Sequence, residues 1–454
     1  MPAHLISKYN VPGPRYTSYP TVPYWDGETF SLKSWKESLQ QSFRESNSSE
    51  GISIYIHLPF CESLCTFCGC NKRITKNHGV EIPYLKAVLK EWSLYVELFD
   101  EKPVIKELHI GGGTPTFFSS ENLKLLLNGL FRKAHKAPNC ELSFEGHPNN
   151  TTRAHLETFA SFGFERVSYG VQDYNETVQR AIHRIQPFEN VKRATDTSRE
   201  LGYTSVGHDL IFGLPFQSKE DVIHTIERTL ELRPDRIAFY SYAHVPWIKG
   251  TGQRGFKETD LPSASEKRAQ YETGKSLLLN AGYMEIGLDH FALPTDHLYQ
   301  AVEDSTLHRN FMGYTASKTQ LMIGLGASAI SDSWYGFAQN VKGVEAYQDL
   351  LANNILPVWR GHILTPEDVI VRKHILNLMC RLETSWEPSK LHFKKLPEVV
   401  ARLNEMEQDE LIEIGISSLK ILEKGRPFVR NVCMAFDLRL QEKHPETQLF
   451  SMTI

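Results

Sequence analysis

The chain has 454 residues, of which 41% are hydrophobic, and this is enough for a large core and more than one domain. The formal net charge of -4 disfavours a nucleic-acid-binding protein, which would carry a basic surface. No stretch approaches the roughly 18 uncharged apolar residues of a membrane-spanning helix, so we expect no membrane insertion.

Two further features concern the cellular location. The first residues contain no apolar segment of the kind that a signal peptide carries. Seven cysteines in a chain of this length are too few, and odd in number, for a disulfide framework. We therefore expect a cytoplasmic protein with reduced thiols. As a separate expectation, the protein is taken to be a monomer.

The chain begins with a predicted arm over residues 1–48. Residues 11–20 are rich in proline and tyrosine, a composition that favours an extended backbone. The polar stretch 46–51 is typical of a linker.

From residue 52, short apolar runs alternate with segments of helical periodicity. Strands are predicted at 53–58, 107–110, 141–145, 166–171, 208–212 and 236–242. Helices are predicted at 84–99, 119–135, 152–162, 188–201 and 219–232. This alternation predicts an α/β fold with a parallel sheet and crossover helices. Six such units fit a complete or partial (β/α)6 barrel of the TIM type, in which the chemistry lies where strands end.

The barrel and its extension are predicted over 49–361, and a mainly helical C-terminal domain over 362–454. The C-terminal domain opens at Thr365-Pro-Glu-Asp368, which combines a capping threonine, a proline at the first helical position and acidic residues in the first turn. The acidic balance of the chain favours a packing role for this domain over DNA binding.

Four cysteines follow the first predicted strand within ten residues: Cys61, Cys65, Cys68 and Cys70. Cysteine thiolates hold iron–sulfur clusters, and a [4Fe–4S] cube takes four ligands. If only the first three cysteines bind, one iron stays open to the amino and carboxylate groups of a small molecule such as S-adenosylmethionine. The spacing C-x3-C-x2-C resembles the cluster motif of the radical S-adenosylmethionine family.

A structural zinc site is the main alternative for these cysteines. Such a site usually adds a second cysteine pair or histidines at a defined distance. No second C-x2-C pair follows here, and the first histidine after the cysteines is His78. The remaining cysteines, Cys140, Cys380 and Cys433, are expected to be buried small side chains.

Other polar or flexible residues lie where the predicted strands end. Gly111-Gly-Gly-Thr114 would let backbone approach a ligand, although a tight turn would also explain these glycines. Glu145 could bind a ribose hydroxyl, with an exposed loop carboxylate as the alternative. Asp209 lies inside an apolar strand, where an unpaired carboxylate is costly, so it has either a functional role or a structural ion pair.

Four further motifs are specific enough to indicate a family: Pro14-Arg-Tyr-Thr-Ser-Tyr-Pro20, Cys68-Gly-Cys70, Leu307-His-Arg-Asn-Phe311 and Cys433-Met-Ala-Phe-Asp437. With these motifs the chain resembles, nearly from end to end, the family of oxygen-independent coproporphyrinogen III oxidases, which are radical S-adenosylmethionine enzymes. The related haem chaperones match less well, because they lack the proline-rich arm and the Cys-Gly-Cys ending.

The resemblance implies roles for individual residues. Cys61, Cys65 and Cys68 would ligate the [4Fe–4S] cluster, whereas Cys70 would not. Tyr55 and Glu145 would take part in catalysis. The sites for S-adenosylmethionine, of which the family is described as holding two molecules, would be lined by Tyr55, Phe67, Gly111, Gly112, Gly113, Thr114, Glu145, Gln172, Arg184, Asp209, Ala243 and Ile330.

The resemblance also implies a reaction. A 5′-deoxyadenosyl radical would start the oxidative decarboxylation of two propionates of coproporphyrinogen III to vinyl groups, giving protoporphyrinogen IX in haem biosynthesis. An electron donor and an electron acceptor would be needed. The four substrate carboxylates should meet cations or histidine, and Arg15, His290 and Arg309 are candidates.

Two residues depart from the family pattern. His147 stands where Asp or Asn is expected, and Met312 stands where Gln is frequent. Two other kinds of protein stay open at this point. One is a haem-binding or haem-trafficking relative without decarboxylase activity, and the other is a zinc-stabilised binding protein without catalysis.

Overall fold

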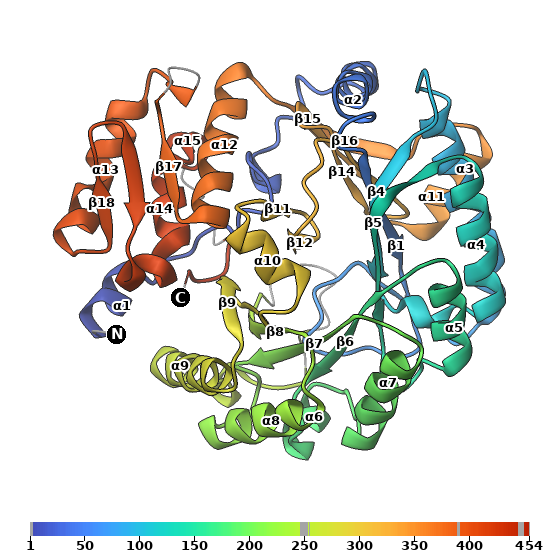
Figure 1. Ribbon diagram of the computed structural model, residues 1–454, viewed down its shortest axis with the longest axis horizontal. Coiled ribbons are helices and arrows are strands. Elements are labelled where there is room, and N and C mark those ends of the chain that lie inside the picture. The colour runs from blue at the N-terminus through green and yellow to red at the C-terminus, as the bar shows by residue number, and fades with distance from the viewer. Residues whose placement is uncertain (1–2, 246–252, 254, 388–390, 444–448, 454) are drawn as a thin grey trace. The chain divides into compact units, whose positions relative to one another are not determined.

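The computed structural model describes residues 3–245, 253, 255–387, 391–443 and 449–453 (Figure 1). The chain forms two compact units. The barrel unit consists of Ser31–Tyr299 and Thr319–Gly361, and the terminal unit consists of Met1–Phe30, Gln300–Lys318 and His362–Ile454.

A twelve-stranded sheet dominates the barrel unit, with the strand order β16-β15-β14-β13-β1-β4-β5-β6-β7-β8-β10-β9. The bounds of its strands, in chain order, are β1 Ile52–Leu58, β4 Val104–Gly112, β5 His135–Gly146, β6 Arg166–Gln172, β7 Ser205–Phe212, β8 Arg236–Ser241, β9 Met284–Gly287, β10 His290–Ala292, β13 Met322–Leu325, β14 Ile330–Asp332, β15 Gly336–Asn340 and β16 Val358–Ile363. A separate parallel pair is formed by β2, Phe60–Cys61, and β3, Arg73–Ile74.

The six predicted strands are neighbours in this sheet and run parallel, from β1 through β4, β5, β6 and β7 to β8. A further strand, β13, pairs parallel with the other side of β1, and β10 pairs antiparallel with β8. The predicted α/β class with a partial (β/α)6 barrel is therefore confirmed. The strand order ends in two different edge strands, β16 and β9, so the sheet is open.

Helices join successive parallel strands along one face of this sheet, as Figure 1 shows for α3, α4, α5 and α7. The α-helices that lie within the barrel unit are α2 Leu32–Ser46, α3 Glu81–Val96, α4 Ser120–Arg132, α5 Arg153–Ser161, α6 Glu176–Ala181, α7 Phe188–Glu200, α8 Lys219–Leu232, α9 Ala264–Asn280 and α11 Val344–Ala352. Short 3-10 helices lie at η2 His78–Val80, η3 Pro115–Phe117 and η4 Glu258–Asp260.

Local sequence signals explain the helix that follows β7. Ser218 accepts a hydrogen bond from the Asp221 backbone, and the Asp221 carboxylate accepts one from the Ser218 backbone, which together form a capping box. Val222 and Ile226 then recur at helical spacing and are fully buried in a cluster with Phe239 of β8. Burial of this stripe fixes α8 against the ends of β7 and β8.

The terminal unit is mainly helical. Its elements are α1 Ala3–Tyr9, η1 Val22–Tyr24, β11 His308–Asn310, β12 Gly313–Thr315, α12 Pro366–Arg381, β17 Glu383–Ser385, α13 Leu396–Gln408, β18 Ile412–Ile414, β19 Ser418–Ile421, η6 Glu423–Phe428, α14 Val429–Phe436 and α15 Leu438–Glu442. Strands β17, β19 and β18 form a small antiparallel sheet. The helix α10, His297–Glu303, spans the boundary between the units.

The segment predicted as an arm contains two helices that the sequence analysis did not predict, α1 and α2. Ser31 caps α2 in a capping box, and Trp35, Leu39 and Phe43 are buried along one face of it. Residues 1–30 belong to the terminal unit and α2 to the barrel unit. The division into an arm, a barrel and a C-terminal domain stays a prediction.

The start of α12 was predicted correctly, since Thr365 accepts a hydrogen bond from the Asp368 backbone N–H at 3.1 Å. In the described part of the chain, no helix combines the length and apolar character needed to cross a membrane.

Candidate active site

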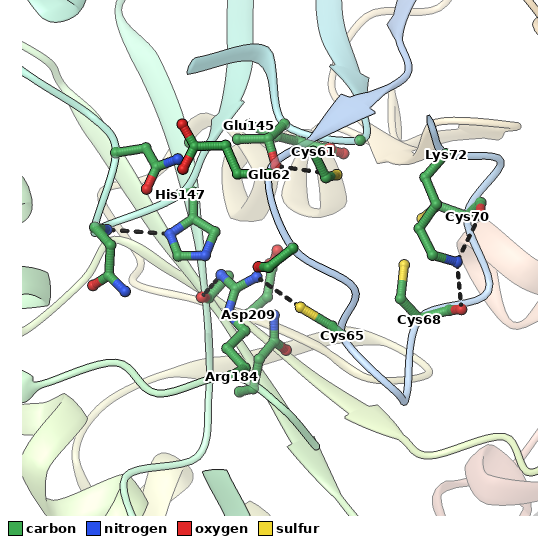
Figure 2. Close-up of a pocket in the computed structure, with 18 of the residues that line it drawn as sticks. Cys61, Glu62, Cys65, Cys68, Cys70, Lys72, Glu145, His147, Arg184 and Asp209 are labelled. Atoms are coloured by element: carbon green, nitrogen blue, oxygen red, sulfur yellow. Dashed lines mark hydrogen bonds between the residues drawn. The ribbon is translucent and has the colours of Figure 1, made fainter. Parts of the chain in front are cut away.

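A cavity of about 470 Å³ lies in the barrel unit where the parallel strands end and the cysteine loop begins. Five successive strands contribute to its lining, among others through Gly112 from β4, Glu145 from β5, Gln172 from β6, Asp209 from β7 and Tyr240 from β8. The predicted site residues that line the cavity are Cys61, Cys65, Phe67, Cys68, Gly112, Gly113, Thr114, Glu145, Gln172, Arg184 and Asp209. Figure 2 shows the cysteine loop on one side of this cavity, facing Arg184 and His147.

Glu145 provides an ionised carboxylate in the cavity. Its Oε2 accepts a hydrogen bond from the Gly112 backbone N–H at 3.2 Å, and its Oε1 lies 3.5 Å from His109 Nε2. Burial alone would raise the pKa of Glu145, but the hydrogen bonds from His109 and Gly112 bring it below the ordinary value. A Cβ atom at Gly111 would lie 2.9 Å from this carboxylate, so only glycine leaves Glu145 its position.

Tyr55, in β1, is not among the residues that line the cavity. Its hydroxyl is 3.0 Å from His57 Nδ1, and His57 Nε2 is 2.8 Å from the Asn71 carbonyl oxygen. Because that carbonyl can only accept, Nε2 carries the proton, and Tyr55 donates to Nδ1. Burial lowers the pKa of His57 and raises that of Tyr55, so both side chains are neutral. This chain of hydrogen bonds joins β1 to the end of the cysteine loop.

The cysteine sulfurs lie around one side of the cavity. Cys61 Sγ is 3.4 Å from Thr114 Oγ1, and Arg184 Nη1 donates to Cys65 Sγ at 3.8 Å. The hydrogen bond from Cys70 lowers the pKa of Cys68 to about 6, whereas burial raises the pKa of Cys61 to about 11. Cys68 thus has the character of a ligand thiolate, and Cys70 that of its hydrogen-bond donor.

Among the residues that the structure describes, no three His, Cys, Asp or Glu side chains are grouped so as to hold a single metal ion. This arrangement gives no support to a compact zinc site built from Cys61, Cys65 and Cys68. A cube of four irons takes each thiolate at a different iron, so its ligands need not converge on one point. Thiols spread around the rim of one cavity fit such a cluster.

The segment after β6 positions Arg184. Its Nη2 donates to the Gly170 carbonyl oxygen at 2.6 Å and to Gln186 Oε1 at 3.3 Å. Its Nε is buried without a hydrogen-bond partner among the described residues. Gln172, which ends β6, has a positive φ of 69°, an uncommon conformation that places the start of this segment at the cavity.

Asp209 is a buried carboxyl group in β7. Its Oδ1 accepts a hydrogen bond from Ser168 Oγ at 3.0 Å. Burial and the charge of Glu145 raise the pKa of Asp209 to about 7, so it exchanges a proton near neutral pH. For Asp209, the predicted choice between a functional role and a structural ion pair stays open.

Four predicted site residues lie outside the cavity lining. Tyr55 is hydrogen-bonded to His57, and a Cβ atom at Gly111 would meet the Glu145 carboxylate. Ala243 follows β8 and accepts a hydrogen bond from Gln253 Nε2 at 2.8 Å, and Ile330 begins β14. Their roles in cofactor binding stay predictions.

The candidates for the substrate carboxylates are spread over the two units. His290 belongs to the barrel unit, with its Nδ1 3.0 Å from Asp289 Oδ1 and its Nε2 3.5 Å from the hydroxyl of Tyr240. Arg309 belongs to the terminal unit, where it is buried and donates from Nη2 to the carbonyl oxygen of Arg15 at 3.2 Å.

Sequence reasoning missed several residues of the cavity. Lys72, Asn149, Ile185 and Tyr240 line it but were not predicted as site residues. For Tyr240 a signal existed, because it stands near the carboxyl end of a predicted parallel strand. Lys72 donates from Nζ to the carbonyl oxygen of Cys68 at 3.1 Å, a contact that the folding of the cysteine loop creates.

The fold and this site define the class of the protein, which is confirmed by comparison. The Radical SAM superfamily profile matches residues 55–229, a range that contains the cysteine loop and strands from β4 to β7. Radical SAM enzymes use a [4Fe–4S] cluster and S-adenosylmethionine, so this class implies both cofactors.

Individual relatives match almost the whole chain, and not only the range of the superfamily profile. The oxygen-independent coproporphyrinogen III oxidase of Helicobacter pylori (strain 26695) is 38% identical over 453 residues, which cover 97% of each chain. That of Escherichia coli (strain K12) is 37% identical over 455 residues, covering 99% of this chain and 98% of the relative. The solved structure of coproporphyrinogen III oxidase (HemN) from Escherichia coli, described as a radical SAM enzyme, superposes with a TM-score of 0.88 at 34% identity, over 96% of this chain and 98% of that one. The chain belongs to the oxygen-independent coproporphyrinogen III oxidase family.

Proposed function

We propose that this protein converts coproporphyrinogen III to protoporphyrinogen IX without oxygen, in haem biosynthesis. The observation that carries the proposal is the family relation over almost the whole chain. The cavity supports it, because a cysteine loop, a glycine-lined strand end and an ionised carboxylate face one another there.

The cluster is held by Cys61, Cys65 and Cys68, and the fourth iron is left open for the cofactor. The thiols fit this role because all three line the same cavity and one of them has a lowered pKa. Cys70 acts as the hydrogen-bond donor that stabilises the Cys68 thiolate and stays outside the ligand set.

When bound, the cluster and S-adenosylmethionine would supply the radical chemistry that removes one β-hydrogen from a propionate of the substrate. Loss of carbon dioxide and one electron then leaves a vinyl group in place of the –CH2–CH2–COO⁻ side chain. A second propionate follows in the same way.

The residues of the chain bind and orient these partners. Glu145 accepts hydrogen bonds from the nucleotide, and the glycines at Gly112 and Gly113 let the backbone approach it closely. Tyr55 is held in place by its hydrogen bond to His57, with 3.0 Å between the Tyr55 hydroxyl and His57 Nδ1.

A second molecule of S-adenosylmethionine is proposed beside the first, in contact with Phe67, Gln172, Arg184, Asp209 and Ala243. The buried Arg184 Nε, which has no partner among the described residues, supports a ligand at this position. Two such molecules would match two successive decarboxylations. Tyr55, Gly111, Thr114 and Ile330 are also proposed to line these nucleotide sites, as the family relation implies.

The proposal includes partners that the chain must meet. A one-electron donor reduces the cluster, and an electron acceptor takes up the electron released in each decarboxylation. The protein is proposed to act as a monomer in the cytoplasm, where free thiols such as those of the cysteine loop stay reduced.

An anaerobic turnover assay tests the proposal. Reconstituted protein is mixed with a reductant, S-adenosylmethionine, coproporphyrinogen III and an electron-accepting cell extract, and porphyrins are separated and measured by fluorescence. We expect protoporphyrin from the wild type and none from the Cys65→Ser variant. Cleavage of S-adenosylmethionine without protoporphyrin would contradict the proposal and favour a haem-trafficking role.

A further inference from the structure

His147 lies in the cavity, in the turn that follows β5, and has no part in the proposed function described so far. Its ring Nδ1 accepts a hydrogen bond from the Asn149 backbone N–H at 3.1 Å. Because Nδ1 accepts, the proton of the neutral ring is on Nε2. Burial and the charge of Arg184 lower the pKa of His147 to about 3, so the ring is neutral near pH 7. His147 therefore offers a single, fixed N–H donor.

The backbone holds this ring in place. The His147 carbonyl oxygen accepts hydrogen bonds from the backbone N–H groups of Asn150 and Thr151, both at 2.9 Å, and from Thr151 Oγ1 at 2.9 Å. The His147 N–H donates to Thr116 Oγ1 at 3.3 Å. A turn fixed at both its N–H and its carbonyl gives the side chain little freedom, so the donor is preorganised.

A second donor faces the same space. Arg184 uses Nη2 for the Gly170 carbonyl and directs Nη1 to Cys65, while its Nε is buried and has no partner among the described residues. Figure 2 shows His147 and Arg184 next to each other in the cavity, in agreement with the effect of the Arg184 charge on His147. Asn149 also ties the turn to this segment, because its Nδ2 donates to the Ile185 carbonyl at 2.9 Å.

The carboxylates of the cavity are already engaged elsewhere. Glu145 accepts hydrogen bonds from Gly112 and His109, and Asp209 accepts one from Ser168. The third carboxylate of the lining, Glu62, has its Oε1 3.8 Å from His78 Nε2. A buried arginine N–H without an acceptor is costly, and a neutral N–H beside it adds a second donor of the same polarity. The chemistry that satisfies both donors is an anionic oxygen pair brought by a ligand.

We propose that His147 and Arg184 form a carboxylate-binding pair, in which one ligand oxygen accepts from His147 Nε2–H and the other from Arg184. The inference rests on the proposed function, because both of its ligands carry this group: S-adenosylmethionine has one carboxylate and coproporphyrinogen III has four. His147 is thus a binding residue that selects for a carboxylate through a neutral donor.

The His147→Asn variant isolates the donor. Asparagine Oδ1 takes the place of Nδ1 and accepts the Asn149 N–H in an Asx turn, so the backbone of the turn is preserved. The Nε2–H is lost. The matched control is His135→Asn, an exposed histidine at the start of the same strand, β5.

Binding is measured with the cluster-loaded enzyme and no reductant, so that no turnover occurs. Three probes are compared by equilibrium dialysis or fluorescence titration: S-adenosylmethionine, coproporphyrin III, and methylthioadenosine, which has the nucleoside but no carboxylate. We expect His147→Asn to lower the affinity for S-adenosylmethionine or for coproporphyrin III by about 10-fold or more, because a hydrogen bond to a charged group is lost. The affinity for methylthioadenosine should not change.

The outcomes show which ligand supplies the carboxylate, and whether the inference or the proposed function fails. Weaker S-adenosylmethionine binding assigns the pair to the cofactor, and weaker coproporphyrin binding assigns it to a substrate propionate. The inference is overturned if His147→Asn binds S-adenosylmethionine and coproporphyrin III as tightly as the wild type does, or if its binding of methylthioadenosine weakens equally. In either case, binding of these probes by the wild type leaves the proposed function standing. If the wild type binds none of the probes and gives no protoporphyrin, the proposed function fails and the inference with it.

Discussion

The backbone N–H of Gly112 donates a hydrogen bond to Glu145 Oε2 at 3.2 Å, and this bond joins the ends of two neighbouring parallel strands, β4 and β5. Together with the hydrogen bond and charge of His109, it lowers the pKa of Glu145 in spite of its burial, so the carboxylate is ionised. It also fixes where the carboxylate can meet a ligand, since the glycine before it leaves room for the side chain.

The Gly111→Ala variant tests this relationship. A Cβ at this position would lie 2.9 Å from the Glu145 carboxyl group, so the carboxylate must move away from Gly112. We expect an affinity for S-adenosylmethionine that is lower by on the order of 10-fold, because a charge-assisted hydrogen bond is disturbed. Equilibrium dialysis measures it. The control is Gly27→Ala, where a Cβ meets nothing within 4 Å; equal affinities in the two variants would contradict the account.

The cysteine loop predicts different results for two neighbouring thiols. Cys65→Ser should lose the cluster, because an iron ligand is removed. Cys70→Ser should keep the iron content of the wild type, since serine can still donate a hydrogen bond to Cys68, whose pKa that bond lowers. Iron and sulfide per chain are measured after anaerobic reconstitution. A loss of iron in Cys70→Ser as complete as that in Cys65→Ser would show that Cys70 is a ligand.

The raised pKa of Glu91 predicts that the free energy of unfolding depends on pH. This buried side chain of α3 accepts hydrogen bonds from Gly326 N–H, Asn340 Nδ2 and Tyr347 OH, and burial raises its pKa from 4.5 to about 7. The unfolded chain releases the proton above pH 4.5 while the folded chain keeps it up to about pH 7. The stability that the bound proton contributes is therefore fully present below pH 4.5 and is lost as the pH rises through about 7, by up to about 1.4 kcal/mol per pH unit.

The Glu91→Gln variant removes this titration. Its melting temperature, compared with that of the wild type, should therefore be relatively higher at about pH 8 than at about pH 5. The exposed Glu200→Gln variant, on α7, serves as the control and should show no such trend. A difference between Glu91→Gln and the wild type that does not change with pH would contradict the assigned shift.

Arg430 predicts how the N-terminal segment is held in the terminal unit. Its Nε donates to the Pro14 carbonyl at 2.8 Å, its Nη2 to the Gly13 carbonyl, and its Nη1 to the Met452 carbonyl at 2.9 Å. Arg430→Ala leaves these buried carbonyls without a donor, a cost of about 1–3 kcal/mol for each. We expect faster proteolysis around residues 10–16, read by mass spectrometry. The exposed Arg193→Ala variant is the control, and equal cleavage rates would contradict the prediction.

Much of the barrel could be predicted from the sequence, because parallel strands buried on both faces appear as continuous apolar runs. For β1 every residue except Tyr55 is buried, and its predicted bounds differ from the observed ones by one residue. The polar residues at the strand ends could be placed in one cavity for the same reason, since parallel strands end at the same edge.

Other features depend on tertiary contacts that a sequence pattern does not contain. The helix α2 begins at a capping serine and carries an apolar stripe. Because the adjacent segments of the chain are rich in proline and polar residues, the sequence pattern predicted an arm there instead of a helix. The hydrogen bond of Tyr55 depends on the position of the His57 ring, and the tautomer of His147 depends on the turn at Asn149. Hydrogen-bond geometry of this kind follows from the folded backbone and could not be predicted from spacing.

The most direct test of the central claim follows the hydrogen that the reaction removes. Coproporphyrinogen III deuterated at the β-carbons of its propionates is converted anaerobically by the reconstituted protein, and 5′-deoxyadenosine is analysed by mass spectrometry beside the porphyrin product. The account predicts protoporphyrin with 5′-deoxyadenosine that carries a single substrate deuterium, one molecule for each vinyl group formed. Deoxyadenosine without deuterium, or protoporphyrin formed without deoxyadenosine, would contradict it.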